Sequence, residues 1–254
     1  MSNTVAAIVQ ARMGSTRLPG KSLMPLAGVP LAGRVLERIK TATRIDKLVL
    51  AIPDTSENDS LEKLAQGYGV SVFRGSEIDL VDRYYNAAKN LSCKYVVRIP
   101  ADNPVPQASE IDRIIDHHLS LNRPGFSSNL AQVYGSKYPD GIGAEIFDFE
   151  LLEEAFEDFS DSSKREHVHL NFFNYATQKA VDEKWCPIST VNCPSDFARP
   201  DIILDVNTQD QFEYMANLYK DLYPSNPNFD IKDIINWHDK NYKQTDKGYE
   251  SNER

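Results

Sequence analysis

The sequence predicts an α/β fold, with a mostly parallel, twisted sheet flanked by helices. Three observations support this prediction. Strand and helix patterns alternate through residues 5–99, the expected strands are short continuous apolar runs, and the segments between them have helical periodicity. Continuous apolar runs are typical of strands that are buried on both faces, as in parallel sheets. Alternation of such strands with helices favours right-handed crossovers between parallel neighbours.

The first half of the chain supplies four strands. Residues 5–9 form the first apolar run, and a loop rich in Gly, Pro and Arg follows it. Pro30 stands near the start of the next pattern, where the first turn of a helix tolerates proline. The remaining elements are expected as a helix at 30–40, a strand at 47–52, a helix at 57–67, a strand at 70–73, a helix at 78–90 and a strand at 95–99.

The second half is less regular. Thr208 is a candidate N-cap for a helix, and residues 139–141 predict a turn. The chain length and the positions of turn-forming and polar residues predict one domain at residues 1–240 and a flexible polar tail at 241–254. Within the domain, a small irregular α+β subdomain is expected at about residues 125–185. The expected elements are helices at 107–119, 149–157, 164–176 and 208–222, and strands near 125–130, 142–147 and 202–206.

Composition and charge narrow the classes of function. The 254 residues carry a net charge of −9, which argues against a nucleic-acid partner because phosphate backbones attract basic faces. The three cysteines lack zinc-site spacing, so we expect free thiols in a reducing cytoplasm. No signal peptide is recognisable, and no apolar run approaches the ~20 residues of a membrane span. We therefore expect a cytoplasmic protein without a membrane partner.

The loop at residues 10–22 concentrates groups that bind phosphate. It directly follows the first buried strand and carries three cations, Arg12, Arg17 and Lys21. Its two glycines allow the backbone to approach a ligand closely and to turn N–H groups toward it. Ligands of open parallel sheets bind beyond the carboxyl ends of the strands, and the loop lies at such an end. We therefore expect these cations to bind the phosphates of a nucleotide.

The loop does not match the P-loop pattern GxxxxGK[ST]. Five residues separate Gly14 from Gly20, whereas that pattern has four. In addition, Pro19 stands where the pattern requires glycine. The expected phosphate contacts therefore belong to a different arrangement of backbone and side chains.

A carboxylate stands just after the fourth strand. Asp102 lies within residues 100–104, at the same edge of the sheet as the cationic loop. Mg²⁺ in proteins takes one or two carboxylates together with phosphate oxygens and waters, so we expect Asp102 to bind Mg²⁺ (or Mn²⁺). A second carboxylate must come from far along the chain, and Asp205 in the expected strand at 202–206 is the best candidate.

Several separated motifs together resemble one protein family. The segment RMGSTRLPGK (12–21), after an apolar strand, is similar to the signature of the cytidylyltransferases that activate sugar acids, such as the CMP-KDO and CMP-sialate synthetases. It resembles still more closely the spore-coat polysaccharide SpsF-like branch. The resemblance spans residues 4–220 and continues through FRGSEIDLVDRYYNAAK (73–89), RIPADNP (98–104), YPDGIGAEIF (138–147), SKREHV (163–168) and LDVNTQDQF (204–212).

The resemblance implies a fold and an activity. The fold would be the Rossmann-like nucleotide-diphospho-sugar transferase fold, in which the subdomain at about residues 125–185 serves the acceptor and dimerisation. The protein would be a CTP-dependent nucleotidyltransferase that transfers CMP to a small acidic sugar-like or phosphate-bearing acceptor and releases pyrophosphate. Such a reaction belongs to activated-sugar and surface-polysaccharide biosynthesis, and a homodimer is expected.

One motif departs from the family pattern. The related synthetases have Asp-Thr-x-x-Asp where this chain has Asn207-Thr208-Gln209-Asp210, and Asp205 lies two residues before Asn207. Positions i and i+2 of a strand face the same side. Asp205 would then supply a charge to the metal and Asn207 a neutral oxygen. A purely structural role for Asp205 is the alternative.

The resemblance and the local chemistry together assign roles to residues. Positioning and electrostatic stabilisation dominate nucleotidyl transfer, and we expect the catalytic contacts from Arg12, Lys21 and Arg17. The nucleotide-binding residues are expected to be Ala7, Gln10, Ala11, Arg12, Gly14, Ser15, Lys21, Arg74, Ser76 and Asp102. The acceptor-binding residues are expected to be Arg98, Asn103, Tyr138, Asp140, Glu145, Arg165 and His167. In the predicted helix at 164–176, Arg165 and His169 would share a face.

Two other functions remain open from the sequence. A glycosyltransferase that uses a nucleotide sugar would share the sheet, but such enzymes typically carry Asp-x-Asp after the fourth strand, where this chain has Ala101-Asp102-Asn103. A nucleotide-binding protein without turnover would explain Asn207, although Arg12, Lys21 and Asp102 are all in place.

Overall fold

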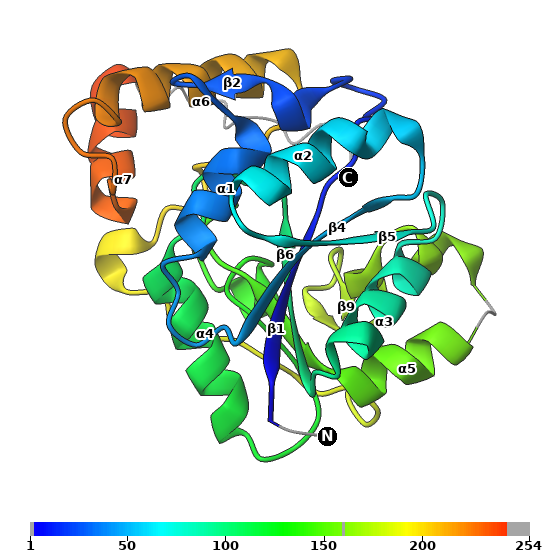
Figure 1. Cartoon of the computed structure of the whole chain (residues 1–254). Coiled ribbons are helices and arrows are strands. Elements are labelled where there is room, and N and C mark those ends of the chain that lie inside the picture. Colours follow the sequence, from blue (N-terminus) through cyan, green and yellow to red (C-terminus); the bar gives the residue numbers. More distant parts are fainter. Residues whose placement is uncertain (1–2, 159–160, 243–254) are drawn as a thin grey trace.

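A seven-stranded sheet forms the centre of the protein (Figure 1). The computed structural model describes residues 3–158 and 161–242. Neighbouring strands are parallel except at β8, which is antiparallel to both of its neighbours. The expected mostly parallel α/β sheet is confirmed. Its strand order is β11 (Ile188–Ser189), β7 (Phe126–Ser128), β8 (Glu145–Asp148), β6 (Tyr95–Pro100), β1 (Val5–Gln10), β4 (Lys47–Pro53) and β5 (Ser71–Gly75).

The first half follows the predicted alternation of strands and helices. Asp79 caps the third helix, because its carboxylate accepts a hydrogen bond from the backbone N–H of Asp82 at 2.8 Å. A two-stranded hairpin, β2 (Pro25–Leu26) and β3 (Val29–Pro30), precedes the first helix. The helices of this half are α1 (Leu31–Ile39), α2 (Asp59–Gly67) and α3 (Leu80–Leu91), and α4 (Ala108–Ser120) follows after β6.

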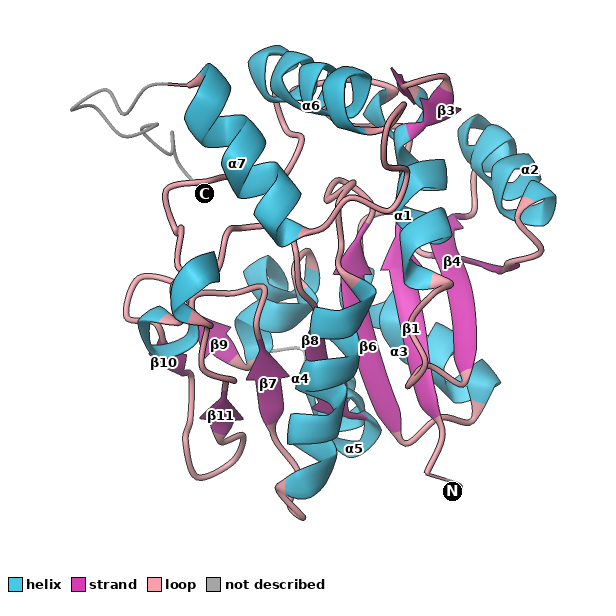
Figure 2. Cartoon of the chain, turned by 90° about the vertical axis from the view of Figure 1, so that its left-hand side faces the viewer, coloured by secondary structure: helices cyan, strands magenta, loops and turns pink. Residues whose placement is uncertain are grey.

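Helices cover both faces of the sheet (Figures 1 and 2). β1 shows why, since Ala7 and Val9 pack on one face and Ala6 and Ile8 on the other, all four fully buried. On the first face the core includes α1, α2, α4, α6 (Gln209–Leu222) and α7 (Ile231–Asn241). On the second face it includes α3 and α5 (Phe149–Glu157). A strand apolar on both faces therefore predicts the two helical layers correctly.

The last two helices close the first face. Thr208 caps α6 in a capping box with Gln211, as its position predicts. α7 was not predicted, because residues 223–242 are rich in polar groups. The structure shows that Asp230 caps α7 and that Ile234 and Trp237 bury its apolar side. α7 ends at Asn241, the first residue of the expected tail, and residues 243–254 lie outside the described part.

The predicted helix at 164–176 is wrong. Two 3₁₀ turns (Ser162–Arg165 and Val168–Asn171) occupy this segment, and a short strand, β9 (Phe173–Asn174), pairs with β10 (Lys179–Ala180). Phe172 and Phe173 are both fully buried against Phe126. Two adjacent residues of an α-helix point about 100° apart, so this aromatic cluster prevents the single amphipathic helix that the periodicity favoured.

The predicted strand at 202–206 is also wrong. Ile202, Leu204 and Val206 are buried, as the alternating pattern indicates. However, the extended backbone pairs with loops: Leu204 N–H donates to Asp140 O, and Val206 N–H donates to Asp102 O at 2.8 Å. The segment joins no ladder of the sheet beyond an isolated bridge between Asp140 and Ile203.

Within the described residues, no helix has both the length and the apolar character to cross a membrane.

Candidate functional site

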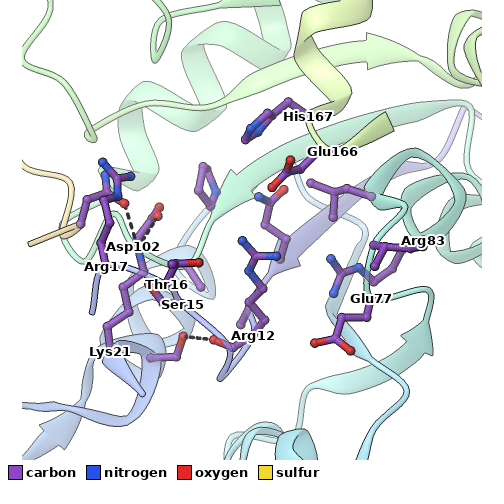
Figure 3. A pocket seen from close by; sticks show the side chains of 18 residues that line it. Arg12, Ser15, Thr16, Arg17, Lys21, Glu77, Arg83, Asp102, Glu166 and His167 are labelled. Carbon is purple, nitrogen blue, oxygen red and sulfur yellow. Dashed lines mark hydrogen bonds and ion pairs between the residues drawn. The ribbon is translucent and has the colours of Figure 1, made fainter. Parts of the chain in front are cut away.

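A cavity of about 350 Å³ opens at the carboxyl ends of β1 and β6 (Figure 3). The loop after β1, the start of α3 with the loop before it, the end of β6 and the loop before α6 all contribute to its walls. These are the parts of the chain where a parallel sheet is expected to bind a ligand. The lining residues are Gln10, Ala11, Arg12, Ser15, Thr16, Arg17, Lys21, Ser22, Glu77, Ile78, Leu80, Arg83, Pro100, Ala101, Asp102, Glu166, His167 and Asn207.

Hydrogen bonds hold the loop after β1 in place. Gly20 has a φ of 72°, a left-handed conformation that glycine adopts without steric cost, and its N–H donates to Met13 O at 3.0 Å. Ser22 Oγ donates to Arg12 O at 3.2 Å, and Asn58 Oδ1 accepts from Met13 N–H at 3.0 Å. The loop is therefore a fixed turn that presents its cations to the cavity.

Lys21 lies in a cage of three oxygens at one end of the cavity. Its Nζ donates to Asp102 Oδ2 at 2.9 Å, to Val206 O at 2.7 Å and to Asn207 Oδ1 at 2.9 Å. Three segments distant in sequence therefore converge on one ammonium group. The sequence predicted that Lys21, Asp102 and Asn207 share a site, and the structure places them together.

Asp205 lies behind this cage and does not line the cavity. Its carboxylate accepts hydrogen bonds from the side-chain amides of Asn207 and Gln211. In this structure Asp205 contacts amides, and its expected metal contact stays a prediction. Residues 204–207 are not a strand, so the i, i+2 argument does not apply, and Asp205 instead orients the amide of Asn207.

The oxygens around Lys21 match the ligands that Mg²⁺ or Mn²⁺ prefers. Asp102 supplies one carboxylate, and Asn207 and the Val206 carbonyl supply neutral oxygens. Magnesium sites in nucleotide enzymes use one or two carboxylates together with substrate phosphates. Among the described residues, no three His, Cys, Asp or Glu side chains gather into a metal site. The residues fit an ion whose remaining ligands come from the substrate.

Arg83 and Glu77 form the opposite end of the cavity, and Arg12 lies between the two ends (Figure 3). Arg83 is only 3% exposed, and among the described residues neither its Nε nor its Nη1 has a hydrogen-bond partner. Burial, with a contribution from the charge of Arg12, lowers the pKa of Arg83 to about 10. At neutral pH the guanidinium is nevertheless charged.

Glu166 and His167 form the upper rim in Figure 3. Partial burial lowers the pKa of His167, and the charges of Arg98 and Arg12 act in the same direction. His167 is therefore neutral at pH 7, and its ring nitrogens present one donor and one acceptor. The expected position of His167 beside the cavity agrees with the structure.

Arg74 and Ser76, two of the expected nucleotide-binding residues, do not line the cavity. Arg74 instead binds α2 and the loop before it through Asp54, Glu62 and the carbonyl of Thr55 at 2.6–3.0 Å. These acceptors fix the guanidinium beside the start of α2. Ser76 Oγ accepts from Asp79 N–H and so helps to start α3.

The expected acceptor residues are mostly structural. Arg98 and Glu145 form a buried ion pair at 2.6 Å below the cavity floor, where Arg98 Nε also donates to Gln10 Oε1 at 3.3 Å. Burial raises the pKa of Glu145 and the Arg98 charge opposes that rise. The pair therefore orients Gln10, which does line the cavity. Neither charged group reaches the cavity itself.

Other acceptor candidates also lie away from the cavity. Tyr138 is fully buried and donates to Glu110 Oε2 at 2.9 Å. Asn103 is buried, and Asp140 pairs through its backbone with Ile203. The polar turn that suggested a substrate contact thus packs against the loop before α6.

Arg165, another expected acceptor residue, has its guanidinium bound by the protein itself. Its Nε and Nη2 donate to Asp79 Oδ2 at 2.8 and 2.6 Å, and its Nη1 donates to Phe156 O at 2.9 Å. This buried arginine joins the N-terminus of α3 to the C-terminus of α5. His169 is buried beside Tyr175, so the two residues share no helix face.

Two expected nucleotide-binding residues near the start of the chain are absent from the cavity lining. Ala7 is fully buried inside the sheet and has no contact with the cavity. Gly14 is not a lining residue either, although a Cβ atom at this position would lie 3.7 Å from Oε1 of Glu77, which does line the cavity. Gln10, Ala11, Arg12, Ser15 and Arg17 line it as expected.

The sequence reasoning missed several lining residues. Arg83 is the most informative, because a signal for it exists: it is three residues after Leu80 and four before Ala87, both buried. A cation on the apolar side of an amphipathic helix is costly unless it has a role. The other missed residues are Thr16, Ser22, Glu77, Ile78, Leu80, Pro100, Ala101 and Glu166.

Comparisons with known proteins identify the family of the chain. A family model described as cytidylyltransferase matches residues 6–187. An uncharacterized protein of Methanocaldococcus jannaschii, MJ1063, is 31% identical over 93% of this chain and 91% of its own. The spore coat polysaccharide biosynthesis protein SpsF of Bacillus subtilis is 30% identical over 86% of this chain and 87% of its own. A 3-deoxy-manno-octulosonate cytidylyltransferase of Anaeromyxobacter dehalogenans is 33% identical over 44% of this chain and 46% of its own.

Solved structures show the same architecture. A cytidylyltransferase from Leptospira borgpetersenii has a TM-score of 0.82 and 28% identity, and the match covers 94% of each chain. A CMP:2-keto-3-deoxy-manno-octonic acid synthetase complexed with CTP has a TM-score of 0.60 at 14% identity and covers 85% of this chain and 98% of its own. The manganese complex of Rv0371C from Mycobacterium tuberculosis has a TM-score of 0.57 at 17% identity, covering 84% and 98%. The last two likenesses show the fold alone.

Proposed function

Because this chain belongs to the cytidylyltransferase family and is a nucleotidyltransferase of that class, we propose that it transfers CMP from CTP to a small anionic acceptor and releases pyrophosphate. The acceptor is a sugar-like acid or a phosphate-bearing alcohol. The similarity to SpsF supports a place in surface-polysaccharide biosynthesis. The neighbour that was solved with CTP supports the choice of nucleotide.

One observation carries the proposal. A single fixed loop presents Arg12, Arg17 and Lys21 to one cavity, and Asp102 faces Lys21 there at 2.9 Å. Within the described residues, the exposed guanidinium groups of Arg12 and Arg17 make no hydrogen bond or ion pair. Both groups are available for phosphate oxygens. A triphosphate carries about four negative charges near neutral pH, and such a concentration of donors would bind it.

The residues would act mainly by position and charge. An acceptor oxygen attacks the α-phosphorus in line, the bond to the bridging oxygen breaks, and pyrophosphate leaves with the electron pair. Negative charge grows on the leaving oxygens, and cations already in place stabilise it without reorganisation. Arg12, in the middle of the cavity, would contact the α-phosphate. Lys21 and Arg17 would hold the leaving pyrophosphate.

Mg²⁺ or Mn²⁺ is the proposed cofactor. Asp102 and Asn207, with the Val206 carbonyl, would hold the ion, and the substrate phosphates would complete its coordination. When bound, such an ion neutralises phosphate charge and makes pyrophosphate a better leaving group. The neighbour solved with manganese supports a divalent ion in this fold.

The acceptor would enter on the side of Glu166 and His167. His167 is the one expected acceptor residue that lines the cavity, and its neutral ring can donate a hydrogen bond to a carboxylate or a hydroxyl group. Arg12 lies within the same cavity and would attract the negative charge of the acceptor.

Self-association remains a prediction, which light scattering of the purified chain would test.

Pyrophosphate release tests the proposal. Wild-type protein would be assayed with CTP, UTP, ATP and GTP in Mg²⁺ against pools of sugar acids, sugar phosphates and other small phosphorylated alcohols. We expect release with CTP in one acceptor pool and a loss of about 10²-fold or more in Asp102→Asn. Asp116→Asn is the matched control, because Asp116 forms an exposed surface ion pair with Arg44.

Other outcomes distinguish the alternatives. Transfer from a nucleotide sugar, without use of a free triphosphate, would assign the protein to the glycosyltransferases. CTP binding without turnover for any acceptor would favour a nucleotide-binding protein, for which Asn207 is the one supporting feature. Equal activity of Asp102→Asn and wild type would remove Asp102 from the mechanism.

A further inference from the structure

Gln211 does not line the cavity, but a chain of hydrogen bonds connects it to the cage around Lys21. It is the third residue of α6, and its Oε1 accepts from the backbone N–H groups of Asn207 and Thr208 at 2.8 and 3.0 Å. Its Nε2 donates to Asp205 Oδ1 at 3.2 Å. The carboxylate of Asp205 also accepts from the side-chain amide of Asn207. The oxygen of that amide accepts from Lys21 Nζ at 2.9 Å and so completes the chain.

The capping box of α6 explains only part of this arrangement. In such a box the N3 side chain accepts a hydrogen bond from the backbone of the N-cap residue, so glutamate and glutamine both serve. At the same position of α7, Asp233 accepts from the backbone N–H of Asp230 and from the side-chain amide of Asn226, both at 3.0 Å. An acceptor is therefore sufficient to begin a helix. The donation from Gln211 to Asp205 is not part of the cap.

The direction of each hydrogen bond in this chain is fixed by its partners. Backbone N–H groups only donate, so the amide of Gln211 must turn its oxygen to them and its NH₂ group to Asp205. A carboxylate only accepts, and Asp205 therefore holds the NH₂ group of Asn207 as well. The oxygen of the Asn207 amide then points away from Asp205, toward Lys21 and the cavity.

This orientation of Asn207 matters for any cation in the cage. The three groups around Lys21 Nζ are all oxygens, and of these only the oxygen of Asp102 belongs to a charged group. Ammonium groups and divalent cations both bind oxygens, whereas an amide NH₂ group presents its hydrogens and repels them. A reversed Asn207 amide would replace one of the neutral oxygens with a donor. Replacement of groups that orient metal ligands typically lowers metal affinity by about 10- to 100-fold.

We propose that Gln211 is a positioning residue of the transfer site, which sets, through Asp205, the end of the Asn207 amide that faces the cation. The inference rests on the proposed divalent ion, to which Asn207 would present its oxygen. Gln211 acts through the two side chains between it and the cavity. Its replacement should therefore change the response to Mg²⁺ and leave the phosphate contacts of the loop after β1 in place.

Gln211→Glu tests the inference, because it keeps the shape and the capping acceptor of the side chain and removes the donor. Its second oxygen would oppose the carboxylate of Asp205, and Asn207 would lose its fixed partner. Calorimetry would measure the affinity of the full chain for CTP in excess Mg²⁺ and in EDTA. We expect Mg²⁺ to strengthen the binding of CTP to wild type. In Gln211→Glu this gain should fall by about 10-fold, with the affinity in EDTA nearly unchanged.

A second substitution should restore the direction of the hydrogen bonds. In the double variant Asp205→Asn, Gln211→Glu, the amide at position 205 would donate to the carboxylate at position 211 and accept from Asn207. The orientation of the Asn207 amide and the net charge would then equal those of wild type. The gain from Mg²⁺ should return to within about 3-fold of the wild-type value, because the two substitutions are coupled through one hydrogen bond.

Asp233→Ala is the matched control for helix capping. It removes the N3 acceptor of α7, so the midpoint of thermal unfolding should fall by about 2–4 °C. The gain in CTP affinity from Mg²⁺ should stay at the wild-type value. An equal loss of this gain in Asp233→Ala and Gln211→Glu would show that general destabilisation causes it, and the inference would be wrong.

Other results would also overturn the inference. A larger gain from Mg²⁺ in Gln211→Glu would show that the added charge strengthens a direct metal contact of Asp205. A double variant as impaired as Gln211→Glu would show that the charge of Asp205 matters and the direction of its hydrogen bonds does not. An unchanged gain in Gln211→Glu would remove Gln211 from the site. A wild type that binds no CTP, or binds it without regard to Mg²⁺, would refute the proposed function or its cofactor, and the inference with it.

Discussion

The two ends of the cavity treat a buried cation in opposite ways. At one end Lys21 has three oxygen partners within 2.7–2.9 Å, supplied by the loop before α6 and the turn after β6. At the other end Arg83 is more deeply buried and has two nitrogens without partners. Among the described residues, the first cation has a full set of partners and the second does not.

This difference has consequences for what each end does. A phosphate at the Lys21 end would compete with contacts that already exist, and its binding would then free these oxygens for another cation. A ligand at the Arg83 end breaks no contact, and the desolvation of Arg83 is complete before the ligand arrives. We therefore expect the first end to control the rate of transfer and the second to control the choice of base.

The largest effect is expected from Lys21→Met. This variant removes a cation beside the leaving pyrophosphate and leaves Asp102 without its ion pair. We expect kcat/KM for CTP to fall by about 10³-fold, with the ratio of CTP to UTP affinity nearly unchanged. Steady-state pyrophosphate release and calorimetry measure the two quantities.

A surface lysine gives the control for this experiment. Lys40 is exposed, and its ammonium donates to the carbonyl of Tyr68, so Lys40→Met should retain wild-type activity. If Lys21→Met instead lost its base preference and kept its rate, the expected roles of the two ends in transfer rate and in choice of base would be refuted.

The Lys21 end was largely predictable from the sequence, and the reason is geometric. Arg12, Lys21 and Asp102 directly follow two adjacent parallel strands, whose carboxyl ends meet at one edge. A local pattern was then enough to bring distant residues together. Asn207 was also placed correctly beside them, although the strand expected there does not form.

The Arg83 end was not predicted, because the burial of a side chain and the presence of hydrogen-bond partners around it depend on the tertiary structure. Arg83 looks like any cation of an amphipathic helix until its neighbours are known. Arg165 failed in the reverse sense: its motif suggested a ligand contact, but Asp79 and the end of α5 already bind its guanidinium. Arg74 failed for the same reason, since α2 supplies its carboxylates. A sequence shows which charges exist, whereas only packing shows which of them are satisfied.

The second prediction concerns stability at the Arg83 end. Arg165→Met removes the partner of Asp79, the residue that caps α3. Loss of one member of a buried pair costs about 3–5 kcal/mol. Because the Asp79 side chain is 25% exposed, we expect about 2 kcal/mol from urea unfolding. KM for the acceptor should remain close to the wild-type value, whereas an increase in that KM without a change in stability would restore Arg165 as an acceptor contact.

The third prediction shifts Arg83 without changing it. In Gly75→Ala the new methyl group meets Phe73 and the stem of Arg83, so the guanidinium must move by a few tenths of an ångström. We expect the preference for CTP over UTP to weaken by about 3- to 10-fold, a cost of about 1 kcal/mol. Gly67→Ala is the matched control, because a Cβ atom there meets nothing within 4 Å. Equal base preference in the two variants would mean that Arg83 tolerates displacement and does not set the ratio.

The smallest effect is expected from Asn207→Asp, which sharpens the comparison at the Lys21 end. The oxygen cage contains one carboxylate, Asp102, and the amide of Asn207 donates to Asp205. Aspartate at this position would add a second charge toward the cation but would also oppose the carboxylate of Asp205. We therefore expect the concentration of Mg²⁺ for half-maximal activity to fall by about 3- to 10-fold.

In the absence of Mg²⁺ the variant should lose about 1 kcal/mol of stability through the lost hydrogen bond and the repulsion, and added Mg²⁺ should restore it. Thermal unfolding with and without Mg²⁺ measures this recovery independently of turnover. A stability loss that Mg²⁺ does not restore, with an unchanged Mg²⁺ requirement, would mean that Asn207 only holds Lys21 and Asp205 in place and that no divalent ion binds among these oxygens.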